Sequence, residues 1–457
     1  MKALILLSSL GTLALLAEIF GFKKRIFLIS LLGLITIFFV NLLDWNLAPN
    51  IFFGMMQYDH YAVAFSSVIL ITAILWFIMS ENFFKEETNR TDRLSLVLFA
   101  LAGAVIMVSY TNMAMLFLGI EILSISMYIL TGTLKDDLNS NEAAFKYLIM
   151  GAFSTGFLLF GIALIYGATG SFDINEIKEF IAARESTAPS IFYVGVLLML
   201  IGLSFKVSAA PFHFWAPDVY QGAPTVITAF MATIVKTAAF AAFLRLFSIS
   251  FSDITATWVN IVWVMTALTL LVGNITAVAQ TSTKRLLAFS SVAHTGYMLL
   301  ALLADNSYSS SAILFYVTAY SFGSIVTFCI LNIIINTYGN DNINSFNGLG
   351  KSNPLLAFVM TLALLSLAGI PPTAGFFAKY YVFTAVFKSG FIYLVLIAIF
   401  ASLVGVYYYF KIIIAMYFKD STNETIQATM NQKILLVVVA FAIIALGIFP
   451  DFIIRLL

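Results

Sequence analysis

The stretch SFKVSAAPFHFWAPD, from Ser204 to Asp218, decides the fold. It directly follows IFYVGVLLMLIGL, a run without any charge, so Lys206 lies deep in a segment with the apolarity of a membrane helix. Pro211 lacks an N–H group, and its ring clashes with the carbonyl of Val207, so the helix is predicted to break here and to free backbone carbonyls. Such carbonyls at membrane depth must face protein or water. The stretch therefore predicts a hydrated pocket beside a lysine.

The composition of the whole chain supports a membrane location. Of its 457 residues, 61% are hydrophobic and only 10% are charged, against about 25% charged residues in soluble domains. A net charge of +1 gives no footprint for nucleic acid. The single cysteine, Cys329, excludes a disulfide framework and an all-protein iron–sulfur cluster. Three histidines scattered along the chain do not suggest a metal site, so no redox centre or bound cofactor is expected in this chain.

Apolar runs of about 20 residues, the length that crosses a bilayer, recur along the sequence. They predict an all-α polytopic membrane protein with 14 transmembrane helices. The first run, residues 1–22, is followed by Lys23, Lys24 and Arg25, which is the wrong order for a cleaved signal peptide, so we expect it to be retained. The loop 168–189 is expected to hold a short amphipathic surface helix. The predicted spans are 3–22, 26–43, 58–80, 93–110, 112–132, 143–167, 190–216, 223–247, 257–280, 285–304, 310–337, 354–388, 390–418 and 433–455.

Two of the predicted helices contain prolines at matching positions in the two halves of the chain. The seventh predicted helix contains Pro211 and the twelfth contains Pro371 and Pro372. Because the two are five helices apart, they cross the membrane in opposite directions, and paired interrupted helices in two inverted halves are typical of a transport site. The expected divisions are an N-terminal three-helix segment, a first five-helix repeat, a second inverted repeat and a last helix, at residues 1–92, 93–247, 248–418 and 419–457.

The Lys and Arg residues of the loops set the orientation. With the N-terminus outside, the inner loops carry about twice as many basic residues as the outer loops. An even number of spans then places both termini on the outer side.

Several titratable side chains lie near the middle of predicted helices, where each charge costs about 2.5–3.5 kcal/mol on insertion scales. Protonated lysines repel cations, so a row of such groups suits proton hopping better than metal binding. Plainer interpretations also exist: a neutral carboxylic acid, a lysine that only caps freed carbonyls, or a hydrogen-bonded core histidine. The candidates for a proton pathway are Glu121, Lys206, Lys236, His294 and Lys379, with His213 as a lesser candidate just past the first break.

We expect Glu121 and Lys206 to form a switch. At about 4 Å and an effective dielectric constant near 20, the pair would be worth roughly 4 kcal/mol. Contact would keep Lys206 charged. Separation would let it release its proton along Lys236 and His294 towards Lys379.

The stretch FKVSAAPFHFWAPDVYQGAPTVITAFMATIVK, residues 205–236, resembles the antiporter-like membrane subunits of respiratory complex I. Within it, PDVYQGAP is similar to the subunit N branch, and so are STKRLLAFSSVAHTGYMLL (282–300) and LSLAGIPPTAGFFAKYYVF (365–383). The resemblance implies 14 helices, inverted five-helix repeats and lysines on broken helices 7 and 12. It places Glu121, Lys206, Lys236 and Lys379 on the proton path of the family, and His213 and His294 on its central polar axis.

The same resemblance implies the function. The chain would be a proton-translocating membrane subunit of a bacterial NADH:quinone oxidoreductase, located in the inner membrane. NADH, FMN, iron–sulfur clusters and quinone would be used by other subunits, and this chain would move protons in response. The implied partners are the lipid bilayer, the neighbouring antiporter-like subunit M, the small subunits J and K, and the lateral helix of subunit L.

Two alternatives stay open at this point. A subunit of a multi-subunit Na⁺/H⁺ antiporter would share the fold, and a membrane anchor of a hydrogenase complex could carry a vestigial row of charges. The sequence has no nucleotide-binding loop, nucleophile elbow or metal cluster that would indicate an independent enzyme.

Overall fold

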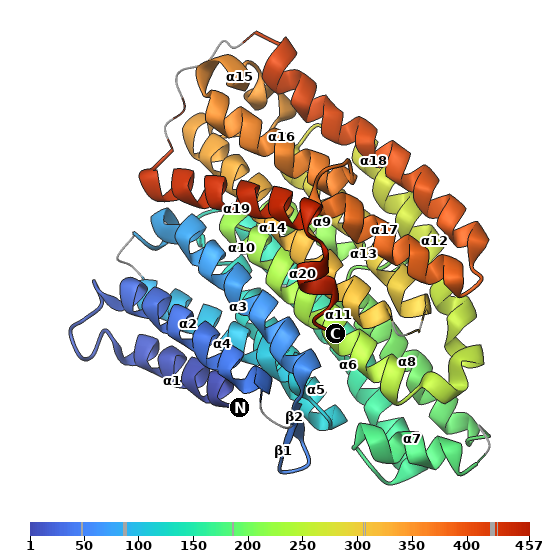
Figure 1. Ribbon diagram of the computed structural model, residues 1–457. Coiled ribbons are helices and arrows are strands. Elements are labelled where there is room, and N and C mark those ends of the chain that lie inside the picture. Colours follow the sequence, from blue (N-terminus) through green and yellow to red (C-terminus); the bar gives the residue numbers. More distant parts are fainter. Residues whose placement is uncertain are drawn as a thin grey trace.

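The computed structural model describes residues 1–46, 49–85, 89–184, 187–304, 306, 308–420, 426 and 428–457. These residues form a bundle of helices (Figure 1). Within the described ranges, eleven helices are long and apolar enough to cross a membrane, and three shorter helices are also apolar: Lys2–Leu16, Ser190–Lys206 and Pro354–Ala368. The prediction of a helical polytopic membrane protein is confirmed. A small hairpin of β1 (Asn50–Phe52) and β2 (Met56–Tyr58) was not predicted.

Most helices lie where the apolar runs predict them. In chain order they are α1 (Lys2–Leu16), α2 (Ile26–Leu43), α3 (His60–Ser80), α4 (Arg90–Ser109), α5 (Met113–Thr131), α6 (Leu138–Thr169), α7 (Ile174–Ala182), α8 (Ser190–Lys206), α9 (Trp215–Gly222), α10 (Thr225–Phe230), α11 (Lys236–Ile249), α12 (Thr255–Val278), α13 (Thr283–Ala304), α14 (Ser309–Tyr338), α15 (Leu349–Ser352), α16 (Pro354–Ala368), α17 (Ala374–Lys388), α18 (Ile392–Phe418), α19 (Met430–Ile448) and α20 (Asp451–Ile454).

Two predicted ends were wrong. Helix α1 ends at Leu16 rather than near residue 22, because Gly21 takes a positive φ of 77° and the chain turns back, with the Phe22 N–H donating to the Ala17 carbonyl. The predicted last helix, 433–455, is also shorter. Helix α19 ends at Ile448, two residues before Pro450, and only the one-turn α20 follows. The predicted surface helix in the loop 168–189 is confirmed as α7.

The first interruption comes earlier than Pro211 itself. Helix α8 ends at Lys206, so Val207 is the first residue outside it. This is the residue whose carbonyl the ring of Pro211 excludes from helical bonding. Ser208 takes a left-handed φ of 61°, and α9 then begins at Trp215.

The second interruption separates α16 from α17. Helix α16 ends at Ala368, and Gly369 at φ 84° closes it, with the Gly369 and Ile370 N–H groups both donating to the Leu365 carbonyl. Pro371 and Pro372 follow before α17 begins. A non-glycine residue at 369 would be strained by its φ and would also meet the side chain of Lys379.

The same backbone clamp occurs twice in the chain. Isolated antiparallel bridges join Asn112 to Asp173 and Ser282 to Asn342. Each ties the link before one helix, α5 or α13, to the link after the next, α6 or α14. The hydrogen bonds also match in pattern: Met113 N–H to Phe172, Ile174 N–H to Thr111, Thr283 N–H to Asp341, and Ile343 N–H to Thr281.

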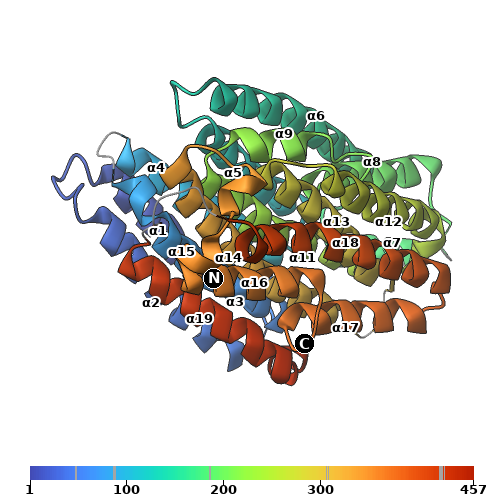
Figure 2. The ribbon, with the colours of Figure 1, turned by 90° about the horizontal axis from the view of Figure 1, so that it is seen from above.

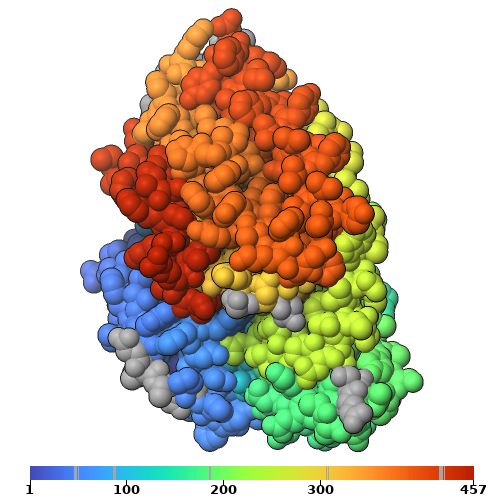
Figure 3. Space-filling model, turned by 45° about the vertical axis from the view of Figure 1, so that its right-hand side comes forward, coloured from blue at the N-terminus to red at the C-terminus, as the bar shows by residue number. Residues whose placement is uncertain are grey.

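Contacts between helices join the N-terminal segment to the rest of the bundle. Helices α1 and α2 lie at one edge, where they pack on α4 and α3 (Figure 1). Helix α19 packs on α3 as well as on α14, α16 and α17, so the C-terminal helix joins the N-terminal segment to the second half (Figure 2). In the space-filling view, the orange and red C-terminal helices occupy one end of the molecule, while the blue N-terminal segment and green α7 occupy the other (Figure 3). The centre is formed by α10, α11, α13 and α14, whose apolar windows are wholly buried.

Candidate functional site

Lys206 is the last residue of α8 and is 7% exposed. Its ammonium donates to the Ser124 hydroxyl at 2.9 Å and approaches the Tyr128 hydroxyl at 3.4 Å, both from α5. The carbonyls freed by the break have other partners. The Trp215 indole donates to the Phe205 carbonyl at 3.0 Å, and the Thr295 hydroxyl donates to the Val207 carbonyl at 2.5 Å. Lys206 therefore does not cap the broken helix.

In this structure Glu121 and Lys206 lie apart, which is the separated arrangement of the predicted switch. No carboxylate–ammonium distance of 4.0 Å or less joins them, and Glu121 Oε1 has no hydrogen-bond partner although it is buried. Ser124, three residues further along α5, takes the place beside the lysine instead. The sequence could not predict this separation, because a helical sequence fixes the depth of both groups in the membrane but not the distance between them.

Lys236 begins α11, directly after a π-helical turn at Met231–Val235. Such turns occur often at functional sites. The side chain is 2% exposed. Its ammonium donates to the Ser291 carbonyl at 2.6 Å, the Ser291 hydroxyl at 2.5 Å and the Thr295 hydroxyl at 3.0 Å. All three of its N–H donors thus meet neutral oxygens on α13.

Thr295 joins the first break to Lys236. Its hydroxyl accepts from Lys236 and donates to the Val207 carbonyl at 2.5 Å. Thr295 therefore links Lys236 to the backbone carbonyl one residue after Lys206, whereas the Lys206 ammonium itself bonds α5. Sequence reasoning missed this residue, although it lies four residues after Ser291, on the same face of α13.

His294 lies at the centre of a group of tyrosines and is buried. Its Nδ1 is 2.8 Å from the Tyr316 hydroxyl, and its Nε2 is 3.1 Å from the Tyr409 hydroxyl. In the neutral ring one nitrogen accepts and the other donates. The ring also packs 4.7 Å from the ring of Tyr320, whose hydroxyl donates to Ser291 at 3.0 Å. His294 is thus connected, through tyrosine, to the partner of Lys236.

Lys379 lies on α17 beyond the second break. Its ammonium donates to the Ala368 carbonyl at 2.6 Å and the Ser402 hydroxyl at 2.8 Å, and lies 4.7 Å from the centre of the Tyr297 ring. A small cavity of about 10 Å³ separates it from His294, which is roughly the space that one water molecule needs. The distance from histidine to lysine can therefore be bridged by water.

His213 stays apart from this network. It is buried in the link between α8 and α9, its ring contacts Phe214, and its Nδ1 has no hydrogen-bond partner. The structure therefore places Lys206, Lys236, His294 and Lys379 in one buried region, with Glu121 about one helical turn from Ser124, the partner of Lys206, and with His213 outside this network. The groups that sequence reasoning missed are hydroxyls: Ser124, Tyr128, Ser291, Thr295, Tyr316, Tyr320, Ser402 and Tyr409.

Comparison with known proteins agrees with the resemblance to the membrane subunits of complex I that the sequence shows. The family model described as NADH:quinone oxidoreductase/Mrp antiporter, TM matches residues 110–405. NADH-quinone oxidoreductase subunit N of Cytophaga hutchinsonii is 44% identical, over 100% of this chain and 99% of its own. A chain of respiratory complex I from Thermus thermophilus superimposes with a TM-score of 0.86 at 32% identity, covering 99% of this chain and 98% of that chain.

A chain of the Mrp complex from Dietzia superimposes equally well, with a TM-score of 0.87, but at 20% identity, covering 99% of this chain and 95% of that chain. This likeness is one of fold alone. The full-length identity to named subunits and the buried row of lysines and histidine agree on one assignment. The chain belongs to the family of NADH-quinone oxidoreductase N subunits, the proton-translocating membrane subunits of respiratory complex I.

Proposed function

We propose that protons cross this subunit along Lys206, Lys236, His294 and Lys379. The observation that carries the proposal is the threonine that joins Lys236 to the backbone beside Lys206. Thr295 bonds both Lys236 and the carbonyl of Val207, the residue next to Lys206. Lysine releases a proton readily when it is buried, and the hydroxyls between the groups can accept and donate in turn.

The second part of the row runs through tyrosine and one water. Tyr320 links Ser291 to the ring of His294, and the small cavity between His294 and Lys379 has room for about one water molecule. We propose that water molecules complete the steps in which no hydrogen bond joins the polar atoms. His294 relays between the two halves in this account, and His213 takes no part.

Glu121 is proposed as the switch of this row. Its unpaired, buried oxygen is costly to leave without a partner. A rotation of the carboxylate past Ser124 would bring it to Lys206 and hold the lysine protonated. The separated arrangement corresponds to the state in which Lys206 gives up its proton.

Repeated backbone bridges and repeated helix pairs support a design of two inverted repeats. We propose that the three shorter apolar helices also cross the membrane, which gives 14 spans with helices 7 and 12 broken. The repeated clamps, Asn112 to Asp173 and Ser282 to Asn342, occupy matching positions in residues 93–247 and 248–418. The packing pairs match too: α4 on α5 and on α11 in the first half, α12 on α13 and on α18 in the second. Residues 1–92 and 419–457 flank the two repeats.

The membrane setting follows from the loop charges. We place both termini on the outer side of the bacterial inner membrane, because basic residues favour the inner loops. The other membrane subunits of complex I are the partners, and among them we propose subunits M, J and K and the lateral helix of subunit L as neighbours. NADH, FMN, iron–sulfur clusters and quinone are assigned to other subunits.

The test is a Lys236→Met variant in the assembled complex, reconstituted in vesicles. Methionine keeps the length of the side chain but cannot carry a proton. We expect NADH-driven proton pumping to fall while Lys351→Met, which changes a lysine that is 75% exposed, pumps normally. Normal pumping by the assembled Lys236→Met complex would sink the proposal. Sodium-dependent transport by the complex without NADH or quinone would instead favour an antiporter.

A further inference from the structure

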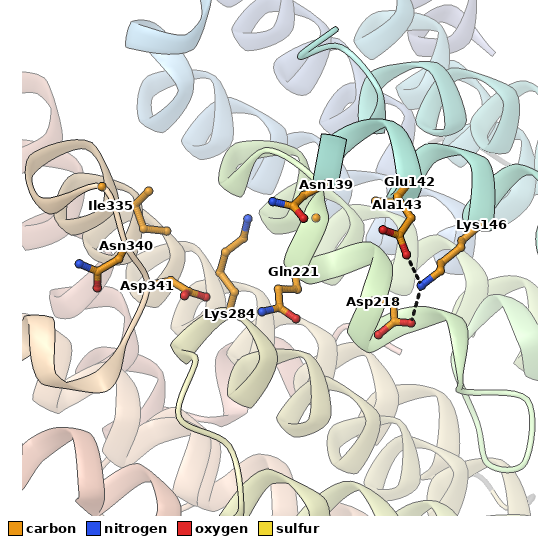
Figure 4. Close-up of a pocket in the computed structure, with 12 residues that line it drawn as sticks. Asn139, Glu142, Ala143, Lys146, Asp218, Gln221, Lys284, Ile335, Asn340 and Asp341 are labelled. Carbon is orange, nitrogen blue, oxygen red and sulfur yellow. Dashed lines mark hydrogen bonds and ion pairs between the residues drawn. The ribbon is translucent and has the colours of Figure 1, made fainter. Parts of the chain in front are cut away.

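Two adjoining cavities lie on the side of the protein that carries the basic loops. Each has a volume of about 370 Å³, enough for several water molecules. Both are bordered by Asn139, Gln221 and Lys284. In Figure 4, Lys284 extends between Asp341 and Asn340 on one side and Gln221 and Asn139 on the other. An ion-pair cluster forms the opposite wall: Lys146, from α6, bonds Glu142 and Asp218.

Lys284 lines both of these cavities. The sequence places it in a loop, but it lies on α13 and is only 8% exposed. Its ammonium donates to the Ala223 carbonyl at 2.6 Å. The carboxylates of Asp137 and Asp341 face it from α6 and from the link after α14, yet within the described residues neither comes within 4.0 Å as an ion pair. Two of its three donors thus remain for water.

The position of Lys284 on α13 points towards Lys236. Ser291 and Thr295, which bond Lys236, lie seven and eleven residues further along the helix. Such spacings place all three side chains on one face of α13. Seven residues correspond to roughly 10 Å along the axis. The Tyr220 hydroxyl of α9 contacts Ser291, and the neighbouring Gln221 lines both cavities.

We propose that Lys284 takes up protons from the inner cavity and passes them along this face of α13 to Lys236. This inference rests on the proton path proposed above and adds its entrance. The ammonium of Lys284 gives one proton through water and hydroxyls to neutral Lys236, and neutral Lys284 takes up a proton from the inner solvent, which the cavity water carries to it. The Ala223 carbonyl holds the ammonium in position between transfers.

A purely structural role makes a different demand on the side chain. Ala223 is the C-cap of α9, and a lysine can stabilise a helix end by bonding its last carbonyls. That role needs only a hydrogen-bond donor. Proton uptake needs a group that titrates. Glutamine and histidine at position 284 separate the two, because glutamine donates without titrating and histidine titrates near pH 6.5.

The experiment measures protons pumped per NADH by the complex in vesicles between pH 6 and 8.5, for the wild type, Lys284→Gln, Lys284→His and Lys236→Met. We expect Lys284→Gln to lose pumping at every pH, as Lys236→Met does. Lys284→His should pump at the acidic end and lose pumping as the pH rises past the pKa of its imidazole, relative to the wild-type profile. The amount of assembled complex is measured first, and if Lys284→Gln does not assemble, the pH profile of Lys284→His alone decides.

Two results would overturn the inference. Wild-type pumping by Lys284→Gln beside a defective Lys236→Met would remove Lys284 from the path and leave the path itself intact. An equal loss in Lys284→Gln and Lys284→His at every pH would assign Lys284 a structural role only. Normal pumping by Lys236→Met would contradict the proposed function itself, which keeps the two failures distinct.

Discussion

The two helix breaks differ in which groups satisfy the carbonyls that they free. At the first break, Trp215 and Thr295 bond the Phe205 and Val207 carbonyls, and Lys206 turns to the hydroxyls of α5. At the second break, Lys379 itself bonds the Ala368 carbonyl. A lysine beside a break can therefore act as a part of the backbone structure or be relieved of that task. Only the first arrangement leaves the ammonium without a backbone acceptor to hold it.

The largest effect is expected from removing each lysine in turn. Lys379→Met leaves the buried carbonyl of Ala368 without its donor, which costs about 1–3 kcal/mol. Lys206→Met leaves only hydroxyls, and Ser124 retains its bond to the Ile120 carbonyl. Thermal unfolding of the two purified complexes should therefore show this subunit less stable with Lys379→Met than with Lys206→Met. Equal stabilities would erase the difference between the two breaks.

Packing against the second break gives the next test. A methyl group added at Gly447 of α19 would overlap the carbonyl oxygen of Pro372, which belongs to the backbone and cannot move aside easily. We expect Gly447→Ala to cost about 1–3 kcal/mol of stability. The matched control is Gly156→Ala on α6, where no atom lies within 4 Å of the added carbon. A Gly447→Ala subunit as stable as its control would mean that the second break is not held rigidly.

The next prediction concerns the hydrogen bond that the Trp215 indole donates at the first break. Trp215→Phe keeps the aromatic packing but removes the donor to the Phe205 carbonyl, at a cost of about 1–2 kcal/mol for a buried acceptor. Trp263→Phe, at a partly buried tryptophan of α12, serves as the control for the loss of ring size. Melting temperatures compare the two. If they are shifted equally, the bond of Trp215 does not support the break.

The smallest effect is expected at Asp218, in the first turn of α9 beyond the first break. Burial raises the pKa of this carboxyl, but the hydrogen bonds from Lys146 and Arg285 outweigh it and hold the pKa below its ordinary value. The folded-state pKa is lowered, so this stabilisation is present above the ordinary pKa of about 4 and is lost as the pH falls through the folded-state value. Because Asp218 is partly exposed, Asp218→Asn should cost at most about 1 kcal/mol at pH 7. A wild-type advantage that persists unchanged under strongly acidic conditions contradicts this.

Much of the site could be predicted from particular residues. Charges at membrane depth indicated Lys206, Lys236 and Lys379 as candidates, and prolines predicted both breaks, including the freed carbonyl of Val207, one residue after the end of α8. The distance between Glu121 and Lys206 could not be predicted, because it depends on how α5 packs against α8. Lys284 was misplaced for the same reason, since packing of α9 and α14 buries a residue whose local sequence resembles a loop.

The bonding partners were beyond the sequence for a different reason. Serine, threonine and tyrosine are common in these helices, and most of them bond a carbonyl of their own helix, as Ser109 and Thr266 do. Nothing in the sequence separates those from Thr295 or Ser291, which bond across helices. Only the packing of α13 between α11 and the first break makes the difference.

The most direct measurement is the number of protons moved per NADH by complexes with Lys206→Met, compared with wild type and with Lys178→Met on the exposed face of α7. Loss of a positioned proton carrier typically costs about 10²-fold or more in transfer rate. The account predicts that the Lys206→Met ratio falls while assembly and the Lys178→Met ratio stay normal. A fully assembled Lys206→Met complex with the wild-type ratio would contradict it.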